Sequence, residues 1–590
     1  MYNVLLVYPK FPVSFWGGEF TREMTRKKAN MPPLGLLTVA ALFPRDKYRL
    51  HLIDMNVEPL RPQDLNGIDM VCTSTMVVQQ ESLQDVITLC ADRNVPIVAG
   101  GPHPTSFHDS IPGVSHFLLG EVEGYFQHFL SDWERGLAKP VYQPEYYPDN
   151  PMTWRTLEKV PLPRYDLINP KNYQTMCLQF SRGCPFDCEF CDITVLYGRV
   201  PRTKTNAQVI AEMDLLYKVG WRGNIFFVDD NFIGNKKRVR EVLPEIIVWQ
   251  QAHSYPFALN TEASLNLAKI EGLPELMVQA GYDMVFTGIE SISLRALKQT
   301  SKVQNIDKDD PDFLLHAVKK LQSVGLEVTA GFINGLDGDN DEGTFDRQIA
   351  FIQQAGIATA MTGLLTVMRA TRLYHRMQEE QRLLGESSGN NVSISLNYIP
   401  EMPANMLIAG YKRVIGSLYD KHLKNYFDRA FTMIKRLQPH PYLKRELHWT
   451  DLRAISLSLL KQTFSAHGKN YLVFLLKVVL RRPRHLATAV SAAVKGYHFR
   501  KITRNMLQVH SFDLFLEQEK EKLLVFLDNL VNPTRHDLQQ FLANLREDIE
   551  KKRRRINQRF QADIEVKLNN FYNHITDYLP WQLEKEKIYQ

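Results

Sequence analysis

Short apolar runs that alternate with longer helical patterns limit the possible folds of this 590-residue chain more than any other feature. Within the first 138 residues, runs rich in β-branched side chains are separated by segments long enough to form a helix. This alternation predicts a doubly wound parallel sheet, whose ligand lies beyond the carboxyl ends of the strands. The predicted strands cover residues 3–9, 49–55, 70–76, 95–101 and 115–121.

A second series of alternating patterns follows residues 139–170, a stretch rich in proline and aromatic residues that predicts a linker laid across a surface. Each strand candidate of this second series precedes an amphipathic helix pattern. Six such βα units predict an incomplete (βα) barrel, in which chemistry occurs at the carboxyl ends of the strands. The candidates cover residues 177–183, 224–230, 257–263, 284–290, 327–333 and 359–367.

Beyond residue 394 the strand signal fades, and the remaining segments read as helices with charged faces. The chain is also too long for a single hydrophobic core. We therefore predict an α/β protein with a helical end. Its expected parts are a Rossmann-like domain over 1–138, a linker over 139–170, a partial barrel over 171–394 and a mostly α-helical region over 395–590.

Three of the six cysteines, Cys184, Cys188 and Cys191, form a C-x3-C-x2-C cluster just after the first predicted barrel strand. So few cysteines do not resemble a secreted disulfide framework, and clustered thiolates are typical ligands of iron–sulfur clusters and of zinc. Three ligands in one loop leave one metal position for a substrate. A zinc site with Cys177 as its fourth ligand, or three reduced cysteines without metal, remain alternatives.

With Phe190 before its last cysteine, this motif resembles the signature of radical S-adenosylmethionine enzymes. The resemblance implies that the three cysteines hold a 4Fe–4S cluster, whose open iron binds the amino and carboxylate groups of S-adenosylmethionine. One electron, from a flavodoxin- or ferredoxin-type donor, then yields a 5′-deoxyadenosyl radical. The protein binds and orients the cofactors and excludes water.

The same resemblance assigns S-adenosylmethionine contacts to other strand ends. It places two aspartates of "VDDNF" at the amino end of the cosubstrate, although a helix N-cap is an equal alternative for them. It places two glutamates near the ribose, and the glycines of "GFINGLDGD" near the adenine. The acidic run 337–342 has glycine at the wrong position for an EF-hand, and we predict a solvated loop there. The assigned residues are Asp229, Asp230, Glu262, Glu290, Gly331 and Gly335.

An N-terminal doubly wound domain joined to such a barrel resembles the cobalamin-binding class of these enzymes. The likeness extends through "PPLGLLTVAAL", "AGGPHPT", "LGEVEG" and "YGRVPRTKT", and the helical extension is similar to that of hopanoid C-2 methylases and bacteriochlorophyll-pathway methylases. Without the resemblance, the paired glycines 100–101 indicate a tight turn as readily as a cofactor loop. The cobalamin contacts that it implies are Thr73, Ser74, Gly100, Gly101, Gly120 and Glu121.

The resemblance implies methylation of an unactivated carbon on a small hydrophobic substrate, a polycyclic lipid or a tetrapyrrole-like pigment. The alternatives are a radical reaction without methylation, such as cyclisation or rearrangement, and a cobalamin- or redox-sensing regulator. Two departures from the family pattern stand out. The D-x-H-x-x-G motif, whose histidine ligates cobalt, is absent, and the loop after the sixth strand carries Arg369 and Arg372, which would meet either an anionic group or solvent.

The C-terminal region contains an apolar run, 471–480, that is too short to span a bilayer and is followed by basic residues. Such a stretch indicates either a membrane-surface element or a core helix followed by a basic surface helix. Basic runs at Arg481 and Lys551 lack an aromatic stacking pattern, so no nucleic acid partner is expected. No signal peptide pattern opens the chain, and we expect a cytoplasmic protein that is either free or peripheral to the membrane.

Overall fold

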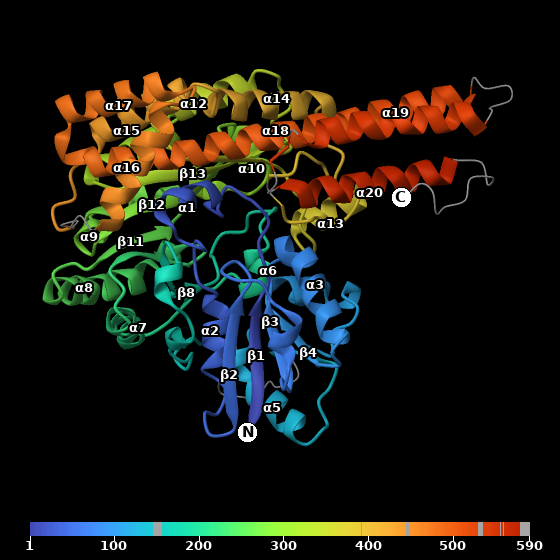
Figure 1. Cartoon of the computed structure of the whole chain (residues 1–590). Helices are drawn as coiled ribbons and strands as arrows, with labels where there is room; N and C mark the ends of the chain where they lie inside the picture. The colour runs from blue at the N-terminus through green and yellow to red at the C-terminus, as the bar shows by residue number, and fades with distance from the viewer. Residues whose placement is uncertain are drawn as a thin grey trace. The chain divides into compact units, whose positions relative to one another are not determined.

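The computed structural model divides into two compact units (Figure 1). The first comprises Met1–Asn391 and Ser395–His498, and the second comprises Val392–Ile394 and Phe499–Gln590. The residues that the structure describes are 1–144, 156–390, 392–443, 449–528, 535–554, 556–557 and 560–578.

The first unit opens with the predicted doubly wound sheet. Its strands run parallel in the order β2-β1-β3-β4-β5-β6, so the strand order reverses beside β1, where ligands of such sheets bind. The two residues of β6 lie within the range predicted as a linker. The strands are β1 (Tyr2–Tyr8), β2 (Tyr48–Asp54), β3 (Met70–Ser74), β4 (Ile97–Gly100), β5 (His116–Leu118) and β6 (Val141–Tyr142).

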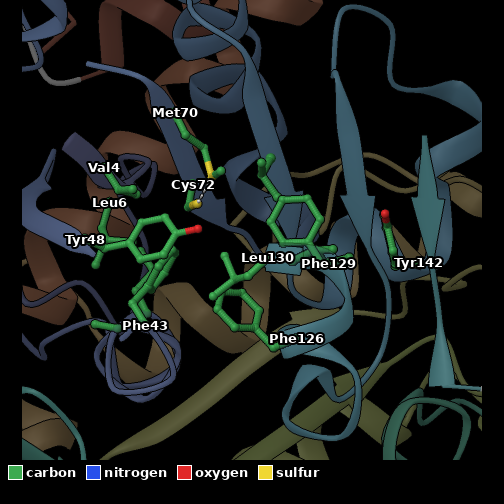
Figure 2. Packing of buried hydrophobic residues seen from close by; sticks show 14 of the residues in the cluster. Val4, Leu6, Phe43, Tyr48, Met70, Cys72, Phe126, Phe129, Leu130 and Tyr142 are labelled. Atoms are coloured by element: carbon green, nitrogen blue, oxygen red, sulfur yellow. Dashed lines mark hydrogen bonds between the residues drawn. The ribbon is translucent and has the colours of Figure 1, made fainter. Parts of the chain in front are cut away.

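Helices cover both faces of this sheet, because alternate residues of β1 point to opposite sides. Val4 and Leu6 pack with Phe126 and Phe129, as Figure 2 shows, whereas Leu5 lies in a cluster on the other face. Both faces are apolar, which explains the unbroken hydrophobic run in the sequence. The helices here are α1 (Glu19–Thr25), α2 (Leu34–Ala40), α3 (Gln80–Ala91), α4 (Pro102–Phe107) and α5 (Phe126–Glu134).

The second sheet confirms the predicted partial barrel. Its six strands are parallel and follow sequence order, β14-β13-β12-β11-β10-β7. One predicted strand, 177–183, is divided: β7 ends at Leu178, and β8 (Ser181–Arg182) pairs antiparallel with β9 (Arg202–Thr203). The barrel strands are β7 (Met176–Leu178), β10 (Gly223–Phe227), β11 (Phe257–Glu262), β12 (Tyr282–Glu290), β13 (Glu327–Asn334) and β14 (Ala360–Leu364).

Helices connect the barrel strands as the amphipathic patterns predict. Gly325 and Gly356 end two of them in the left-handed conformation that suits a helix C-terminus. These helices are α6 (Ile193–Tyr197), α7 (Asn206–Lys218), α8 (Lys236–Ala252), α9 (Leu273–Gln279), α10 (Leu294–Gln299), α11 (Phe313–Val324), α12 (Thr344–Ala355) and α13 (Arg372–Glu379).

From Ala404 onward the elements of the described chain are helices, as predicted. In the first unit lie α14 (Ala404–Leu418), α15 (Lys424–Arg436), α16 (Trp449–Thr463) and α17 (Gly468–Arg481). The long α18 (Leu486–Asp528) begins in the first unit and continues into the second, which also contains α19 (Arg535–Arg553) and α20 (Gln561–Tyr578). Among the described residues, no helix has both the length and the apolarity needed to cross a membrane.

Candidate functional site

The three clustered cysteines lie in the loop that follows β8. All three are free thiols, and the backbone N–H of Cys191 donates to the carbonyl of Cys188 at 3.1 Å. Two amide side chains donate toward the sulfur atoms: Asn231 Nδ2 lies 3.8 Å from Cys184 Sγ, and Gln304 Nε2 lies 3.3 Å from Cys188 Sγ. The sequence prediction missed both amides, because Gln304 is far along the chain and Asn231 had no distinguishing pattern beyond following "VDD".

Asp229 fixes the segment that leads into this loop. Its buried carboxylate accepts the backbone N–H groups of Phe180, at 3.0 Å, and of Ser181, together with the Ser181 hydroxyl. Burial raises the pKa of Asp229 to about 7, in spite of these hydrogen bonds. The contact explains why the predicted strand 177–183 is divided, because the N–H groups of Phe180 and Ser181 point to a side chain just after β10. It also differs from the contact to S-adenosylmethionine that was predicted.

Lys302 lies beside the cysteine loop and was not predicted. Its Nζ is 2.9 Å from Glu290 Oε1. Burial alone lowers the pKa of Lys302, but Glu290, Cys188 and Cys191 raise it above its ordinary value. Glu290 ends β12 with φ +64°, at a register shift, and a Cβ on Gly288 would lie 2.1 Å from its Oε1. At the end of β12, Glu290 therefore combines a strained backbone with a carboxylate that pairs with the largely buried cation of Lys302.

Two further predicted carboxylates lie at the ends of the neighbouring strands. Burial raises the pKa of Asp230 to about 6 while the backbone N–H of Gly183 stabilises its charged form. Burial, with the nearby charges of Asp230 and Glu290, raises the pKa of Glu262 to about 8. The structure thus brings Asp230, Glu262 and Glu290 together at the ends of β10, β11 and β12. Such a group can bind an ammonium group or hydroxyls.

Cys177, the fourth ligand in the zinc alternative, lies elsewhere. It is in β7 opposite Phe226, near Tyr8 and Tyr165, whose pKa values are raised mainly by burial and to a smaller extent by the Cys177 thiol. Among the described residues, no three His, Cys, Asp or Glu side chains are spaced for a single metal ion. The thiolates of a 4Fe–4S cluster bind different irons and need not converge on one point, so a set of three free thiols fits such a cluster.

The two predicted glycines of the adenine region have different neighbours. Gly331, in β13, pairs with Gly288, and a Cβ there would lie 3.1 Å from Phe286 Cζ. Gly335 follows β13 and contacts Tyr398, whose hydroxyl donates to its carbonyl at 2.6 Å. Because Gly331 has no side chain, it leaves space beside Phe286. Gly335 leaves space for Tyr398, which packs on the barrel.

The residues predicted to bind cobalamin lie at one edge of the N-terminal sheet. Ser74 pairs with Gly100 and Gly100 with Leu118, which brings the carboxyl ends of β3, β4 and β5 together. Gly101 has φ +95°, and a Cβ there would lie 2.7 Å from the backbone nitrogen of Thr75. This edge therefore gathers Thr73, Ser74, Gly100, Gly101 and Gly120.

Three buried polar atoms at this edge have no hydrogen-bond partner within the described part of the chain: Thr73 Oγ1, Thr75 Oγ1 and His103 Nδ1. Burial lowers the pKa of His103 to about 4, so its ring is neutral at pH 7. Buried polar groups are nearly always hydrogen-bonded, and a ligand bound at this edge can supply the missing partners of these three atoms. They fit a large polar ligand such as cobalamin. Thr75 and His103 were not predicted, although "AGGPHPT" was a matching segment.

Glu121, the remaining predicted cobalamin residue, is engaged by the barrel. Its two carboxylate oxygens accept from Arg182 at 2.7 Å and from Arg202 at 2.6 Å, and Arg182 also binds Glu123 at 2.7 Å. These four side chains are only 9–12% exposed. Arg182 precedes Cys184 by two residues. This ion-pair network therefore connects the loop after β5 to the hairpin that leads into the cysteine loop.

The two arginines after the sixth barrel strand also have partners inside the protein. Arg369 donates to both carboxylate oxygens of Asp109 at 3.0 Å, beside the N-terminal sheet. Arg372 donates to the carbonyl of Asp187 at 2.8 Å and to Ser301 Oγ at 3.1 Å. Since Asp187 lies between two of the clustered cysteines, Arg372 supports the cysteine loop.

The prediction of a solvated loop at 337–342 is wrong for its first half. Asp337 is buried and pairs with Arg376 at 2.7 Å and Arg382 at 2.8 Å, while Asp339 accepts the Ser291 hydroxyl at 2.6 Å. The arginines come from a region some forty residues further along the chain. Their charge allows the acidic loop to pack against the barrel.

Models of three families match the chain. The radical SAM superfamily model matches residues 178–346, the B12 binding domain model matches residues 25–130, and a domain of unknown function, DUF4070, matches residues 371–511. The first covers the cysteine loop and most of the barrel, and the second covers the sheet edge with the unpartnered polar atoms. Together they define a radical S-adenosylmethionine enzyme with a cobalamin-binding domain.

Curated relatives are similar over most of the chain. An uncharacterized methyltransferase of Synechocystis is 36% identical over 531 residues, which are 88% of this chain and 96% of the relative. The hopanoid C-2 methylase of Rhodopseudomonas palustris is 32% identical over 443 residues, 74% and 81% of the two chains. The chain belongs to the family of cobalamin-dependent radical S-adenosylmethionine methylases, whose cofactors are a 4Fe–4S cluster, S-adenosylmethionine and cobalamin.

Two further likenesses are weaker. The bacteriochlorophyllide d C-12(1)-methyltransferase of Chlorobaculum tepidum is 25% identical over 389 residues, 64% of this chain and 79% of the relative. The structure of the methyltransferase TsrM from Kitasatospora setae, with cobalamin and a 4Fe–4S cluster bound, has a TM-score of 0.51 at 12% identity. It covers 84% of this chain and 99% of its own, and at this identity the likeness concerns the fold.

Proposed function

We propose that this enzyme methylates an unactivated carbon of a small hydrophobic substrate, a polycyclic lipid or a tetrapyrrole-like pigment. The observation that carries the proposal is the buried ion-pair network of Arg182 and Arg202 with Glu121 and Glu123, which joins the cobalamin edge to the cysteine loop. Two cofactor sites connected in this way suit a reaction that uses both. The substrate class is supported by the hopanoid and bacteriochlorophyllide relatives.

In this proposal Cys184, Cys188 and Cys191 ligate the cluster. The amides of Asn231 and Gln304 donate toward the sulfur atoms, and such hydrogen bonds tune the reduction potential of an iron–sulfur cluster. When bound, the cluster and S-adenosylmethionine supply a 5′-deoxyadenosyl radical for hydrogen abstraction, and cobalamin supplies the methyl group. A flavodoxin- or ferredoxin-type protein delivers the electron.

The carboxylates at the barrel strand ends would bind S-adenosylmethionine. Asp230 and Glu262 are buried near each other and can accept from its ammonium and ribose hydroxyl groups. Glu290 is held by Lys302, which places a cation beside the thiolates and limits the negative charge of the loaded site. Asp229 positions the cysteine loop, and Gly331 leaves space beside Phe286 for the adenine.

Cobalamin would lie on the edge formed by Thr73, Ser74, Gly100, Gly101 and Gly120. The bare backbone at Gly101 permits close approach, and the unpartnered Thr73, Thr75 and His103 atoms would receive hydrogen bonds from the ligand or donate to it. Glu121 contributes indirectly, because its carboxylate is already bound by two arginines.

An aromatic pair supports the hydrophobic substrate. Trp16, from the segment between β1 and α1, lies 4.8 Å from the Phe286 ring of β12. Phe286 alternates onto the same face of β12 as Gly288, whose Cβ position is 3.0 Å from Lys302 Nζ, so this pair faces the site. A substrate of this kind resides in membranes, and we propose that the enzyme works in the cytoplasm, peripheral to a membrane.

The experiment that tests the substrate class offers the anaerobically reconstituted enzyme a hopanoid-type lipid, a bacteriochlorophyllide-type pigment and a polar control such as tryptophan. Mass spectrometry of the products then detects one added methyl group. Methylation of the lipid or the pigment alone supports the proposal, and methylation of the polar control alone contradicts it. A product of unchanged carbon count that forms with 5′-deoxyadenosine would favour cyclisation or rearrangement.

A further inference from the structure

Helix α17 is apolar on two opposite faces. Its inner face buries Tyr471, Phe474 and Val478, and the Phe474 ring stacks on Phe427 of α15 at 5.0 Å. A helix that is apolar all round normally lies inside a protein or a membrane. Here the other face is exposed to solvent, and it requires a partner of its own. The exposed apolar residues on this outer face are Leu472 (45%), Val473 (42%), Leu476 (58%), Val479 (45%) and Leu480 (73%).

The segment just before α17 adds to the exposed apolar surface. Figure 1 shows α16 beside α17, and Ser458 of α16 contacts Tyr471 at 3.2 Å. Leu460 is 61% exposed, and Phe464, in the turn between the two helices, is 85% exposed. Clusters of exposed large apolar side chains mark sites that bind another surface.

The charges on this surface are mostly cationic. Two carboxylates of other elements lie near it: Asp428 of α15 is 3.9 Å from Lys477, and Glu23 of α1 is 3.2 Å from Lys461. Between Asp451 and Asp513 the sequence contains no carboxylate side chain and eleven Lys or Arg residues. Lys469 lies at the start of the exposed stripe of α17, Arg481 is the last residue of the helix and Arg484 follows it. All three are exposed. Cations at both ends of an apolar stripe are the arrangement of helices that lie in the interface of an anionic bilayer.

A bilayer fits this surface better than a protein partner does. The stripe is the convex side of a single helix, and lipid adapts to it, whereas a protein would need a matching groove. Long Lys and Arg side chains can extend to the headgroups while the leucines enter the acyl boundary. A helix of this length, Gly468–Arg481, lies in the interface and does not cross it.

We propose that the outer face of α17, together with Phe464 and the cations Lys469, Arg481 and Arg484, docks the enzyme on an anionic lipid bilayer. The inference rests on the proposed function in one respect: a bilayer-resident substrate could then enter the enzyme without crossing water. The docking itself does not require turnover, so it can be tested separately.

The test is cosedimentation of the anaerobically purified, full-length holoenzyme with vesicles of phosphatidylcholine alone or mixed with phosphatidylglycerol. We expect binding to the mixed vesicles that weakens as salt rises. The double variant Leu476→Gln/Leu480→Gln should reduce binding at least about tenfold, because two leucines no longer enter the acyl boundary. Both side chains are exposed, so folding should persist, and circular dichroism and bound iron verify it.

A matched control changes exposed apolar residues elsewhere in the first unit, Leu137→Gln and Val248→Gln, which are 62% and 66% exposed. Loss of binding in the α17 variant but not in this control supports the proposal. Equal vesicle binding by the α17 variant and the unchanged protein overturns it. So does a concentration-dependent dimer that only the α17 variant loses, because the surface would then bind a second copy of the chain.

Failure of the docking proposal can be distinguished from failure of the proposed function. The α17 variant, assayed with detergent-solubilised substrate, should form 5′-deoxyadenosine and S-adenosylhomocysteine at the rate of the unchanged enzyme. Vesicle binding without either product would contradict the function and leave the docking intact. Both products without vesicle binding would contradict the docking alone.

Discussion

The two parallel sheets of the first unit end in edges of opposite character. The barrel edge, at β10, β11 and β12, carries the carboxylates of Asp230, Glu262 and Glu290 with Lys302 between them and the thiols. The N-terminal edge, at β3, β4 and β5, presents bare glycine backbone and neutral polar atoms, three of which lack a partner among the described residues. The same strand topology thus supports a charged site for a metal cluster and its cosubstrate, and a neutral site for a large ligand.

The difference has an energetic basis. Buried charges are stable only when they are paired or bind a charged ligand, so the barrel edge depends on Lys302, the metal and the cosubstrate for compensation. An unpartnered hydroxyl or imidazole group costs less free energy to bury than an unpaired charge does. A ligand that binds after folding can therefore supply the missing hydrogen bonds. The following experiments change one of these edges or the connection between them, each beside a matched comparison.

The largest effect should come from Cys188→Ala, which removes one cluster ligand. Bound iron and the iron–sulfur absorption should fall, and methylation should become undetectable, because a cluster loses a required thiolate. Cobalamin binding at the other edge should remain. The matched variant Cys177→Ala, in β7, should retain iron; equal loss of iron in both variants would restore Cys177 as a ligand.

The next largest effect should come from Gly101→Ala. The added Cβ would lie 2.7 Å from the Thr75 backbone nitrogen at a φ of +95°, so the loop must move and cobalamin affinity should fall at least about tenfold. Gly136→Ala is the control: its φ is also positive, +69°, but a Cβ there meets nothing within 4 Å. Titration with hydroxocobalamin measures both. Retained affinity in Gly101→Ala would place cobalamin away from this edge.

A smaller effect is expected from Arg202→Gln, which weakens the connection between the edges. Glu121 keeps Arg182, so the fold should persist, but the two sites should be less well aligned. We expect several-fold more 5′-deoxyadenosine per methylated product. The effect should be moderate because one buried ion pair of Glu121 is lost while the pair with Arg182 remains. Arg347→Gln, which breaks an exposed pair with Asp341, should change nothing. An unchanged ratio in Arg202→Gln would make the network purely structural.

The smallest effect concerns the pH dependence of the cobalamin-free protein. The folded-state pKa of His103 is about 4, below the ordinary value of about 6.5, because burial disfavours its charged form. Protonation then favours the unfolded chain, so this residue lowers stability as the pH falls from about 6.5 toward 4. In His103→Asn, the loss of folding stability that His103 causes between about pH 6.5 and 4 should disappear. Thermal unfolding across this pH range measures it, and an identical slope in both proteins would contradict it.

Much of the fold was predictable because periodicity and strand ends are local properties of the sequence. The six parallel barrel strands and the doubly wound sheet follow from alternation alone, and the cysteine spacing identified the loop. The division of strand 177–183 was not predictable, since it depends on Asp229, which lies just after β10 and accepts hydrogen bonds from Phe180 and Ser181.

The parts of the site that sequence reasoning missed depend on contacts between distant segments. Lys302 and Gln304 reach the cysteine loop from more than a hundred residues along the chain. Glu121 was predicted to contact the cofactor, and its binding by two barrel arginines was not predicted. Asp337 was assigned to solvent, and it is buried by Arg376 and Arg382. Charge pairing across the fold decided the roles of Lys302, Glu121 and Asp337, and a hydrogen bond to sulfur decided that of Gln304. Local patterns encode neither kind of contact.

The central claim is that the two unlike edges serve one reaction. The most direct test supplies the anaerobically reconstituted enzyme with reductant, S-adenosylmethionine and a lipid or pigment that it methylates. The amounts of 5′-deoxyadenosine and S-adenosylhomocysteine are then measured in the same reaction. We predict that both form in equal amounts, one of each per methyl group transferred. Formation of 5′-deoxyadenosine with product but without S-adenosylhomocysteine would contradict the claim, because the barrel edge would then act without the cobalamin edge.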